Sequence, residues 1–332
     1  MFVLGAQDPE MMLISDILAR LRDLGLPVKF TWAFGARGNV SASEAYNASS
    51  TFCSKIEEEN IYFVECCLTD EAVKEIITHP SPNFRFLDHH KKGDHGYGME
   101  AKCFLPASSI GQVLEILQQV GLRYHSAGSY SLGEGVKVVL EQSGYYLEAG
   151  QMVNYHLGQS VVATHRIVTE QEVLFVAAAD HCLAAAYHGK CPGVNPDELM
   201  GWRISTRAKF QNLSEDELLA RVDRAREILR KAEATRKNHV DEGPDTEGKC
   251  PLCLGIVDLR EGGGEIQELP EAAVREGLAF LSTTTDRGGR KKVVLQVATS
   301  EQIKWFLGEK NPMELKDCYG DPARGFAGGY IA

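Results

Sequence analysis

Short apolar runs alternate with longer amphipathic segments through the first part of the chain, and this alternation constrains the fold most. The apolar runs are typical of strands, and the longer segments have the apolar spacing of helices. The strand-like runs are residues 2–5, 28–34, 61–66 and 84–87, and the helix-like segments are residues 11–24, 70–78 and 110–120. Strands that alternate with helices form parallel βαβ units. The sequence therefore predicts an α/β fold with a doubly wound, mostly parallel sheet.

The second half of the chain predicts a smaller C-terminal domain. We expect an inserted or irregular, Gly- and Tyr-rich segment at residues 123–150, an alanine-rich helical region at 173–187 and a long charged helix from the capping box at 214–217. Residues 237–249 have the composition of a linker, and strands at 278–283 and 292–297 precede a helix at 300–307. We therefore predict a domain at residues 1–240 and a linker with a smaller C-terminal α/β domain at 241–332.

Size, charge and cysteine usage limit the class of protein. A chain of 332 residues can bury a sizeable core, and a net charge of −11 disfavours a protein that coats long or double-stranded nucleic acid. No apolar run approaches the length of about 20 residues that a membrane span needs. The nine cysteines show no regular spacing, which favours a reducing compartment over a disulfide framework. We expect a cytoplasmic protein without a membrane partner.

Acidic and imidazole side chains follow the strand-like runs. Asp8-Pro9-Glu10 comes after the first run, Glu65 ends the third, and Asp88-His89-His90 comes directly after the fourth. Parallel strands of an open α/β sheet end at the same crevice, so these side chains are expected to converge there, joined by Asp180. Carboxylate and imidazole together suit manganese, iron or zinc. The alternative interpretation of residues 86–98 is a solvated, histidine-rich loop.

These motifs in this order resemble the DHH phosphoesterase superfamily, in particular its RecJ-like and oligoribonuclease/phosphatase-like branch. Two further segments are similar to that branch: Phe104-Leu105-Pro106-Ala107-Ser108-Ser109 at a helix start, and Arg324-Gly325-Phe326-Ala327-Gly328-Gly329 near the end. The resemblance implies hydrolysis of a phosphoester by metal-activated water. It also implies one or two divalent cations, Mn²⁺ first and Mg²⁺ as the alternative, and a short oligonucleotide or nucleotide as substrate.

The resemblance assigns roles to individual residues of this chain. The implied catalytic residues are Asp88 and His90, which position the water and the leaving oxygen. The implied substrate-binding residues are Arg324, Gly328 and Gly329. The implied metal ligands are Asp8, Glu10, Glu65, Asp88, His89 and Asp180.

The chain departs from the family pattern at three positions. The family has a histidine four residues before the first aspartate, where this chain has Leu4, and glutamate replaces aspartate at Glu10 and Glu65. One metal position therefore loses its imidazole. The alternative to an active hydrolase is a catalytically impaired module that binds a nucleotide or metal. A pyrophosphatase or small phosphomonoesterase would share the same metal chemistry.

Two other signals stay open. Cys250-Pro251-Leu252-Cys253 has the spacing of half a zinc site, but it also fits an ordinary thiol pair or a redox pair. His181 either orients Asp180 or is a core histidine. The sequence leaves the oligomeric state undecided.

Overall fold

The computed structural model describes most of the chain in two compact units. The described residues are 1–23, 28–35, 38–41, 44–51, 55–126, 137–141, 144–154, 160–242, 255–260, 266–285, 289–308 and 313–331. The first unit comprises Met1–His89, Gly93–Gly96 and Cys103–Asp180. The second unit comprises His90–Lys92, Tyr97–Lys102 and His181–Ala332. The predicted thiol pair at Cys250 and Cys253 lies outside the described residues.

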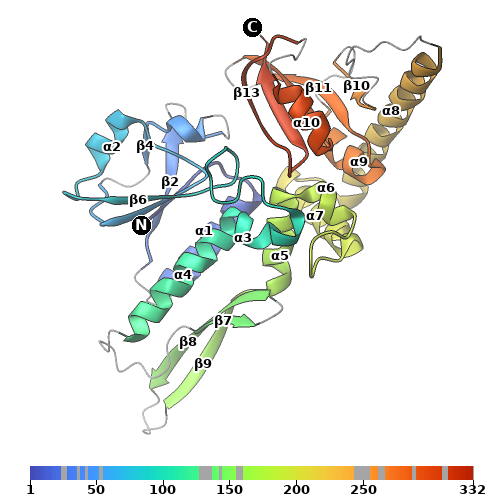
Figure 1. Cartoon of the computed structure of the whole chain (residues 1–332). Coiled ribbons are helices and arrows are strands. Elements are labelled where there is room, and N and C mark those ends of the chain that lie inside the picture. Colours follow the sequence, from blue (N-terminus) through green and yellow to red (C-terminus); the bar gives the residue numbers. More distant parts are fainter. Residues whose placement is uncertain are drawn as a thin grey trace. The chain divides into compact units, whose positions relative to one another are not determined.

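The first unit is built on a mixed sheet whose middle is parallel (Figure 1). Its order is β3-β2-β1-β5-β6, and β1 pairs in parallel with both β2 and β5, as does β5 with β6. The short strands β3 and β4 pair antiparallel with β2. The strands are β1 (Phe2–Leu4), β2 (Phe30–Gly35), β3 (Gly38–Asn39), β4 (Ser50–Thr51), β5 (Asn60–Val64) and β6 (Asn83–Leu87). The predicted α/β class is confirmed, and the doubly wound arrangement stays a prediction.

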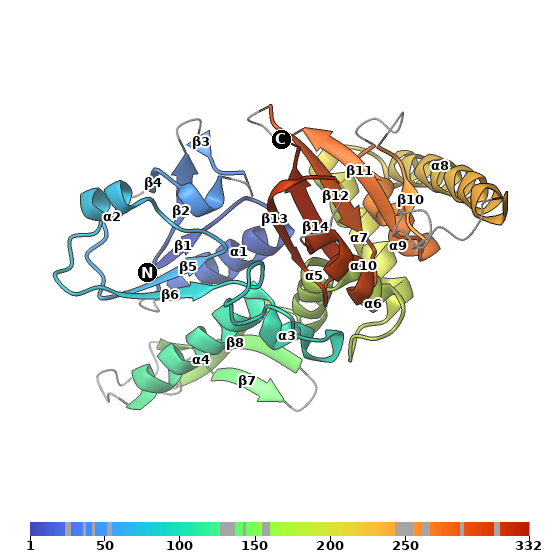
Figure 2. The same cartoon turned by 45° about the horizontal axis from the view of Figure 1, so that its top comes forward.

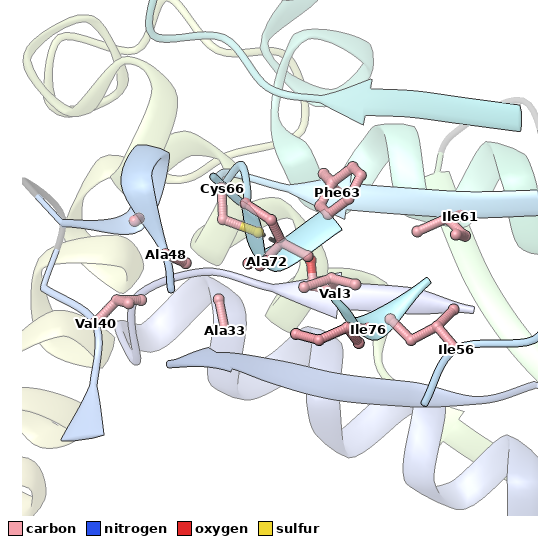
Figure 3. Close-up of a cluster of buried hydrophobic side chains, with 12 residues drawn as sticks. Val3, Ala33, Val40, Ala48, Ile56, Ile61, Phe63, Cys66, Ala72 and Ile76 are labelled. Carbon is pink, nitrogen blue, oxygen red and sulfur yellow. Dashed lines mark hydrogen bonds between the residues drawn. The ribbon is translucent and has the colours of Figure 1, made fainter. Parts of the chain in front are cut away.

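A buried apolar cluster packs against one face of this sheet (Figure 3). Val3, Ala33 and Phe63 lie in neighbouring strands, and Ile76 of helix α2 (Asp70–Ile76) packs against them. Thr69 caps α2, because its side chain accepts a hydrogen bond from the amide of Ala72. Each fully buried side chain of this size contributes about 1.5–3 kcal/mol. The cluster therefore fixes the strand register, which aligns the strand ends.

Helices and a second, antiparallel sheet complete the first unit. The short 3₁₀ helices are η1 (Ala45–Asn47) and η2 (Ala101–Cys103, which the unit boundary crosses), and the α-helices are α1 (Pro9–Asp23), α3 (Phe104–Ala107), α4 (Ser109–Ser126) and α5 (Glu170–His181). A three-stranded antiparallel sheet consists of β7 (Lys137–Glu141), β8 (Gly144–Asn154) and β9 (Ser160–Val168). The segment predicted to be inserted or irregular at residues 123–150 is regular in its described residues, which belong to the end of α4 and to the paired strands β7 and β8.

The second unit holds a five-stranded sheet of order β10-β11-β12-β14-β13 (Figure 2). One face carries Leu281, Leu295 and Ala327, which pack with Ile303 and Phe306 of helix α10. The strands are β10 (Val257–Asp258), β11 (Phe280–Thr285), β12 (Lys291–Gln296), β13 (Lys316–Asp321) and β14 (Phe326–Tyr330), and the helices are α6 (Leu183–Tyr187), α7 (Pro196–Gln211), α8 (Glu215–Glu242), α9 (Leu269–Glu276) and α10 (Ser300–Leu307). The helix predicted at 300–307 thus has the observed bounds.

The long helix α8 belongs with the C-terminal sheet. Its Ala225 and Leu229 pack with Leu269 and Phe280 in one buried cluster. The helix therefore belongs to the second unit, whose longest segment is His181–Ala332, and the domains expected at residues 1–240 and 241–332 stay a prediction. The helical region predicted at 173–187 consists of two helices, since Cys182 has the non-helical angles φ −152° and ψ 47°. The linker predicted at 237–249 includes residues 237–242, but these belong to α8, which continues to Glu242; residues 243–249 lie outside the described residues.

A buried ion-pair network joins three helices of the second unit. Glu271 on α9 is 1% exposed and accepts hydrogen bonds from Tyr187 Oη at 2.5 Å, Arg203 Nε at 3.0 Å and Arg275 Nε at 3.0 Å. Arg207 pairs with the neighbouring Glu268. Burial raises the pKa of Glu271, but the two arginines and the tyrosine outweigh it and hold that pKa below its usual value. The carboxylate is therefore charged and fully hydrogen-bonded.

Candidate metal centre

Three carboxylates of the first unit converge where its parallel strands end. Glu10 lies in the first turn of α1 after β1, Glu65 directly follows β5, and Asp180 lies near the end of α5. One carboxylate oxygen from each lies within 4.8 Å of the others. Neighbouring parallel strands end at the same edge of a sheet, which brings the first two together. The geometry of a cation site is therefore present in a single unit.

The imidazole of His89 completes the cluster. Its Nε2 lies 3.0 Å from Asp180 Oδ2 and 3.6 Å from Glu65 Oε1, and the side chain is fully buried. His89 reaches this position because β6 ends at Leu87, next to β5 in the sheet. His89 Nε2 thus lies beside carboxylate oxygens of Glu65 and Asp180.

The first turn of α4 holds two of these carboxylates in place. Ser109 Oγ donates a hydrogen bond to Glu65 Oε1 at 2.7 Å, and the amide of Ile110 donates to Glu10 Oε1 at 2.9 Å. Both α4 residues are fully buried. The start of a helix carries a partial positive charge from its unsatisfied amides, which favours nearby anions. The sequence therefore uses a serine at this helix start to orient Glu65.

The cluster has the electrostatics of a site that takes a cation. Burial raises the pKa of Glu10 well above its usual value, and the neighbouring Asp180 and Glu65 raise it further, against the Ile110 amide, which lowers it. Glu10 Oε2 is buried without a hydrogen-bond partner. Oxygen ligands on opposite sides of one Mg²⁺ lie about 4.2 Å apart, twice the metal–oxygen distance. The spacing of the carboxylates therefore fits one divalent cation after a small adjustment.

The backbone at Glu65 is strained. Its φ is +49°, a left-handed conformation that non-glycine residues rarely adopt and that costs about 1–3 kcal/mol. Its carbonyl lies so close to Gly5 that a Cβ on Gly5 would be 2.5 Å from Glu65 O. Gly5 is thus required at the end of β1 to admit this turn. Strain at a residue that presents a carboxylate is typical of functional sites.

Asp88 is a hydrogen-bond acceptor beside this cluster. Its Oδ2 accepts from Tyr46 Oη at 2.6 Å and its Oδ1 accepts from the amide of His89 at 2.7 Å, with the residue 4% exposed. The carbonyl of Asp88 accepts from Gln112 Nε2 at 3.1 Å. Burial, and then the charge of Asp88, raises the pKa of Tyr46, so the phenol stays protonated as a donor. These contacts fix the backbone that carries His89.

The remaining residues of the sequence-based prediction are Asp8, Leu4, His90 and His181. Asp8 Oδ1 accepts from the amide of Met11 at 2.8 Å, which caps the start of α1. Leu4 is fully buried at the end of β1. His90 is half-buried and is grouped with the second unit. His181 Nε2 lies 3.3 Å from the carbonyl of Met99, within that same unit.

The predicted substrate-binding residues lie on or next to β14 in the second unit. Arg324 is half-buried in the turn between β13 and β14, and Gly328 and Gly329 lie inside β14. Because β14 pairs with both β12 and β13, the backbone N–H and C=O groups of β14 form hydrogen bonds within the sheet. A Cβ on Gly328 would lie 2.6 Å from the ring of Tyr319, so close packing gives one reason for glycine here.

The sequence-based prediction does not include the residues that contact Asp88 and His89 and so hold them in place. Tyr46 and Gln112 reach Asp88 through long-range hydrogen bonds, for which the sequence carries no local signal. Gly96 is a second case, because a Cβ there would lie 2.0 Å from the carbonyl of Ala107 and 2.6 Å from His89 Cβ. A glycine-rich loop after the histidines is visible in the sequence, but its close approach to His89 is not.

Two further findings limit other interpretations. A cavity of about 230 Å³ over β11 and β12 is lined by uncharged side chains such as Gln267, Ser282 and Gln296, which do not suit a cation. Among the described residues, no helix has both the length and the hydrophobicity of a membrane span.

Comparison with family models, curated proteins and solved structures found no match to this chain.

Proposed function

We propose that this chain is a metal-dependent phosphoesterase that hydrolyses a short oligonucleotide or a small nucleotide. The observation that carries the proposal is the convergence of Glu10, Glu65 and Asp180 within 4.8 Å, with His89 Nε2 beside them. The proposal includes the finer architecture implied by the sequence, a doubly wound metal-binding domain with a smaller substrate domain. The resemblance of the Asp88-His89-His90 region to DHH phosphoesterases supports the same reaction class.

The four residues of the cluster would hold the cation. When bound, a divalent cation lowers the pKa of a water molecule and neutralises phosphate oxygens. Asp88 accepts two hydrogen bonds through its carboxylate, so we assign it the role of positioning His89 rather than that of a ligand. Asp8, which caps α1, would hold Glu10 at the helix start. His90 would act on the phosphate, and Arg324, Gly328 and Gly329 on the substrate.

Mn²⁺ is the cation that this donor set fits best, with Mg²⁺ as the alternative. Three carboxylates and one imidazole form a mostly oxygen set, which favours Mn²⁺ and Mg²⁺ over zinc, whose structural sites use cysteine and histidine. Leu4 has no ligand atom where the family has a histidine, so we expect one tightly bound cation. The net charge of −11 favours a short substrate over a long polyanion.

The test combines metal binding with turnover. Purified protein is titrated with Mn²⁺ by calorimetry and assayed on dinucleotides and on bis(4-nitrophenyl) phosphate. We expect Glu65→Gln and His89→Ala to lose more than about 100-fold in Mn²⁺ affinity, since residues that only support ligands cost about 10–100-fold. Glu57→Gln, a change of the same chemistry at an exposed position, should match the wild type.

Each outcome of this test decides between stated alternatives. Turnover that needs Mn²⁺ and is lost in both variants supports the proposal. If the wild type binds no divalent cation and has no activity, both the metal site and the reaction are refuted. Binding of Mn²⁺ with nucleotide but without turnover would instead identify a catalytically impaired binding module, which the loss of histidine at Leu4 favours.

A further inference from the structure

Two buried thiols of the second unit lie in contact. Cys182 Sγ and Cys191 Sγ are 3.1 Å apart, closer than two sulfur atoms in ordinary non-bonded contact, and each cysteine is 3% exposed. They bracket helix α6: Cys182 directly precedes it, and Cys191 follows the turn after it. The proposed metal chemistry uses neither thiol.

The backbone holds both cysteines in place. The carbonyl of Cys182 accepts from the amide of Ala186 at 3.0 Å in the first turn of α6. After the helix, the amide of Lys190 donates to the carbonyl of Ala185 at 2.9 Å, and the carbonyl of Cys191 accepts from Val194 at 3.2 Å. A disulfide bond is about 2.05 Å long, so the sulfurs need to approach by only about 1 Å.

Three other described cysteines direct their sulfur atoms at backbone carbonyls. Cys66 Sγ donates to the carbonyl of Val3 at 3.3 Å, and Cys67 Sγ donates to that of Leu68 at 3.4 Å. Cys318 is exposed and its Sγ lies 3.7 Å from the carbonyl of Leu315. Among the described cysteines, Cys182 and Cys191 are therefore the pair whose sulfur atoms lie close enough to form a disulfide after a small movement.

We infer that Cys182 and Cys191 are a reversible oxidation site, at which hydrogen peroxide forms a disulfide that closes the loop around α6. One thiol sulfur attacks the peroxide, the O–O bond breaks, and a sulfenic acid and one water form. The second thiol sulfur attacks the sulfenic sulfur, the S–S bond forms, the S–O bond breaks and a second water leaves. The two thiols lose two electrons to the peroxide, and small-molecule thiols reverse the reaction by exchange.

Closing this loop has a mechanical consequence for the second unit. Tyr187, the last residue of α6, donates to the buried Glu271. A disulfide restricts the unfolded chain, so the oxidised protein should resist unfolding better than the reduced one. We expect the melting temperature of the second unit to rise by several degrees on oxidation.

Peptide mapping of the full chain tests the assignment. Reduced protein is treated with hydrogen peroxide, alkylated and digested with trypsin without a reductant. Because trypsin cleaves after Lys190, the disulfide should join the peptides of residues 167–190 and 191–203, with a mass two hydrogens below their sum. Reductant should separate the two peptides and reverse the rise in melting temperature.

Variants make the test decisive. Cys191→Ser should abolish both the linked peptide and the thermal shift, and Cys182→Ser provides the same test if that variant folds poorly. Cys103→Ser, a change at a half-buried cysteine outside the pair, should keep both. If peroxide oxidises Cys103 and Cys318 while residues 182 and 191 stay as free thiols, the inference is refuted. Neither the linked peptide nor the melting temperature requires bound metal or turnover. The outcome of this test is therefore independent of the proposed phosphoesterase function.

Discussion

Replacing Glu10 with glutamine should stabilise the metal-free protein and remove its response to Mn²⁺. Glu10 is 1% exposed, and its Oε1 accepts from the Ile110 amide, which the glutamine oxygen can still do. Its Oε2 has no hydrogen-bond partner, and one of the two Glu10 carboxylate oxygens lies within 4.8 Å of carboxylate oxygens of Glu65 and Asp180. A glutamine amide group in that place is uncharged and can donate to them. The substitution therefore removes a repulsion without removing the hydrogen bond to α4.

The size of the gain follows from the spacing of the charges. Two full charges 4.8 Å apart repel each other by about 3.5 kcal/mol at an effective dielectric constant of 20. The wild type reduces this repulsion, because the raised pKa of Glu10 favours its neutral form. We therefore expect a net gain of about 0.5–2 kcal/mol, the usual range for stabilising changes. Each kcal/mol corresponds to a rise in melting temperature of about 2–4 °C for a domain of this size.

Thermal unfolding with and without Mn²⁺ measures both effects. Wild type should gain about 2.7 kcal/mol at a Mn²⁺ concentration 100 times the dissociation constant, and Glu10→Gln should gain nothing. Ionisation of Glu10 penalises folding above its raised folded-state pKa, so the advantage of the variant should shrink as the pH falls from there towards the unfolded value. A variant that is less stable than the wild type without metal, or that keeps the Mn²⁺ response, would refute the reasoning.

Three further changes test other parts of the structure. Tyr46→Phe leaves the buried Asp88 short of one donor, so we expect a loss of about 1–3 kcal/mol in stability and about 10–100-fold in Mn²⁺ affinity by calorimetry; unchanged affinity would contradict the positioning role. Glu271→Gln should cost about 3–5 kcal/mol at pH 7 in urea unfolding, whereas the exposed Glu227→Gln should cost under about 0.5 kcal/mol. The folded-state pKa of Glu271 is lowered, so the contribution of its carboxylate to stability is present above the usual value of 4.5 and is lost as the pH falls through the folded-state pKa. Equal losses of stability at pH 7 and pH 3 would therefore refute this assignment. Gly96→Ala should cost about 1–3 kcal/mol by overpacking against the chain around His89, and a neutral effect in the same assay would argue against that close approach.

The sequence predicted the parts of the site that depend on local pattern and sheet topology. Glu10, Glu65 and His89 each follow a strand, and parallel strands end together, so their convergence could be expected from the order of the strands alone. The contact from Tyr46 to Asp88 spans 42 residues and depends on how a 3₁₀ helix packs, which periodicity does not encode. In the same way, the apolar face of α8 is visible in the sequence, but its partner in the C-terminal sheet is not. Local rules specify the elements, and tertiary packing decides which elements share a unit.

Leu4 affects the donor set of the cluster, because its side chain supplies no ligand atom. An apolar residue that is fully buried at the end of β1 contributes to the core and offers no ligand atom. The remaining donors bring three negative charges and one imidazole, more charge than one divalent cation neutralises. The start of α4 compensates part of this excess through Ser109 and the Ile110 amide. If the cluster binds the proposed cation, the cation would offset the remaining repulsion among the carboxylates, so we expect the stability of the first unit to rise with Mn²⁺.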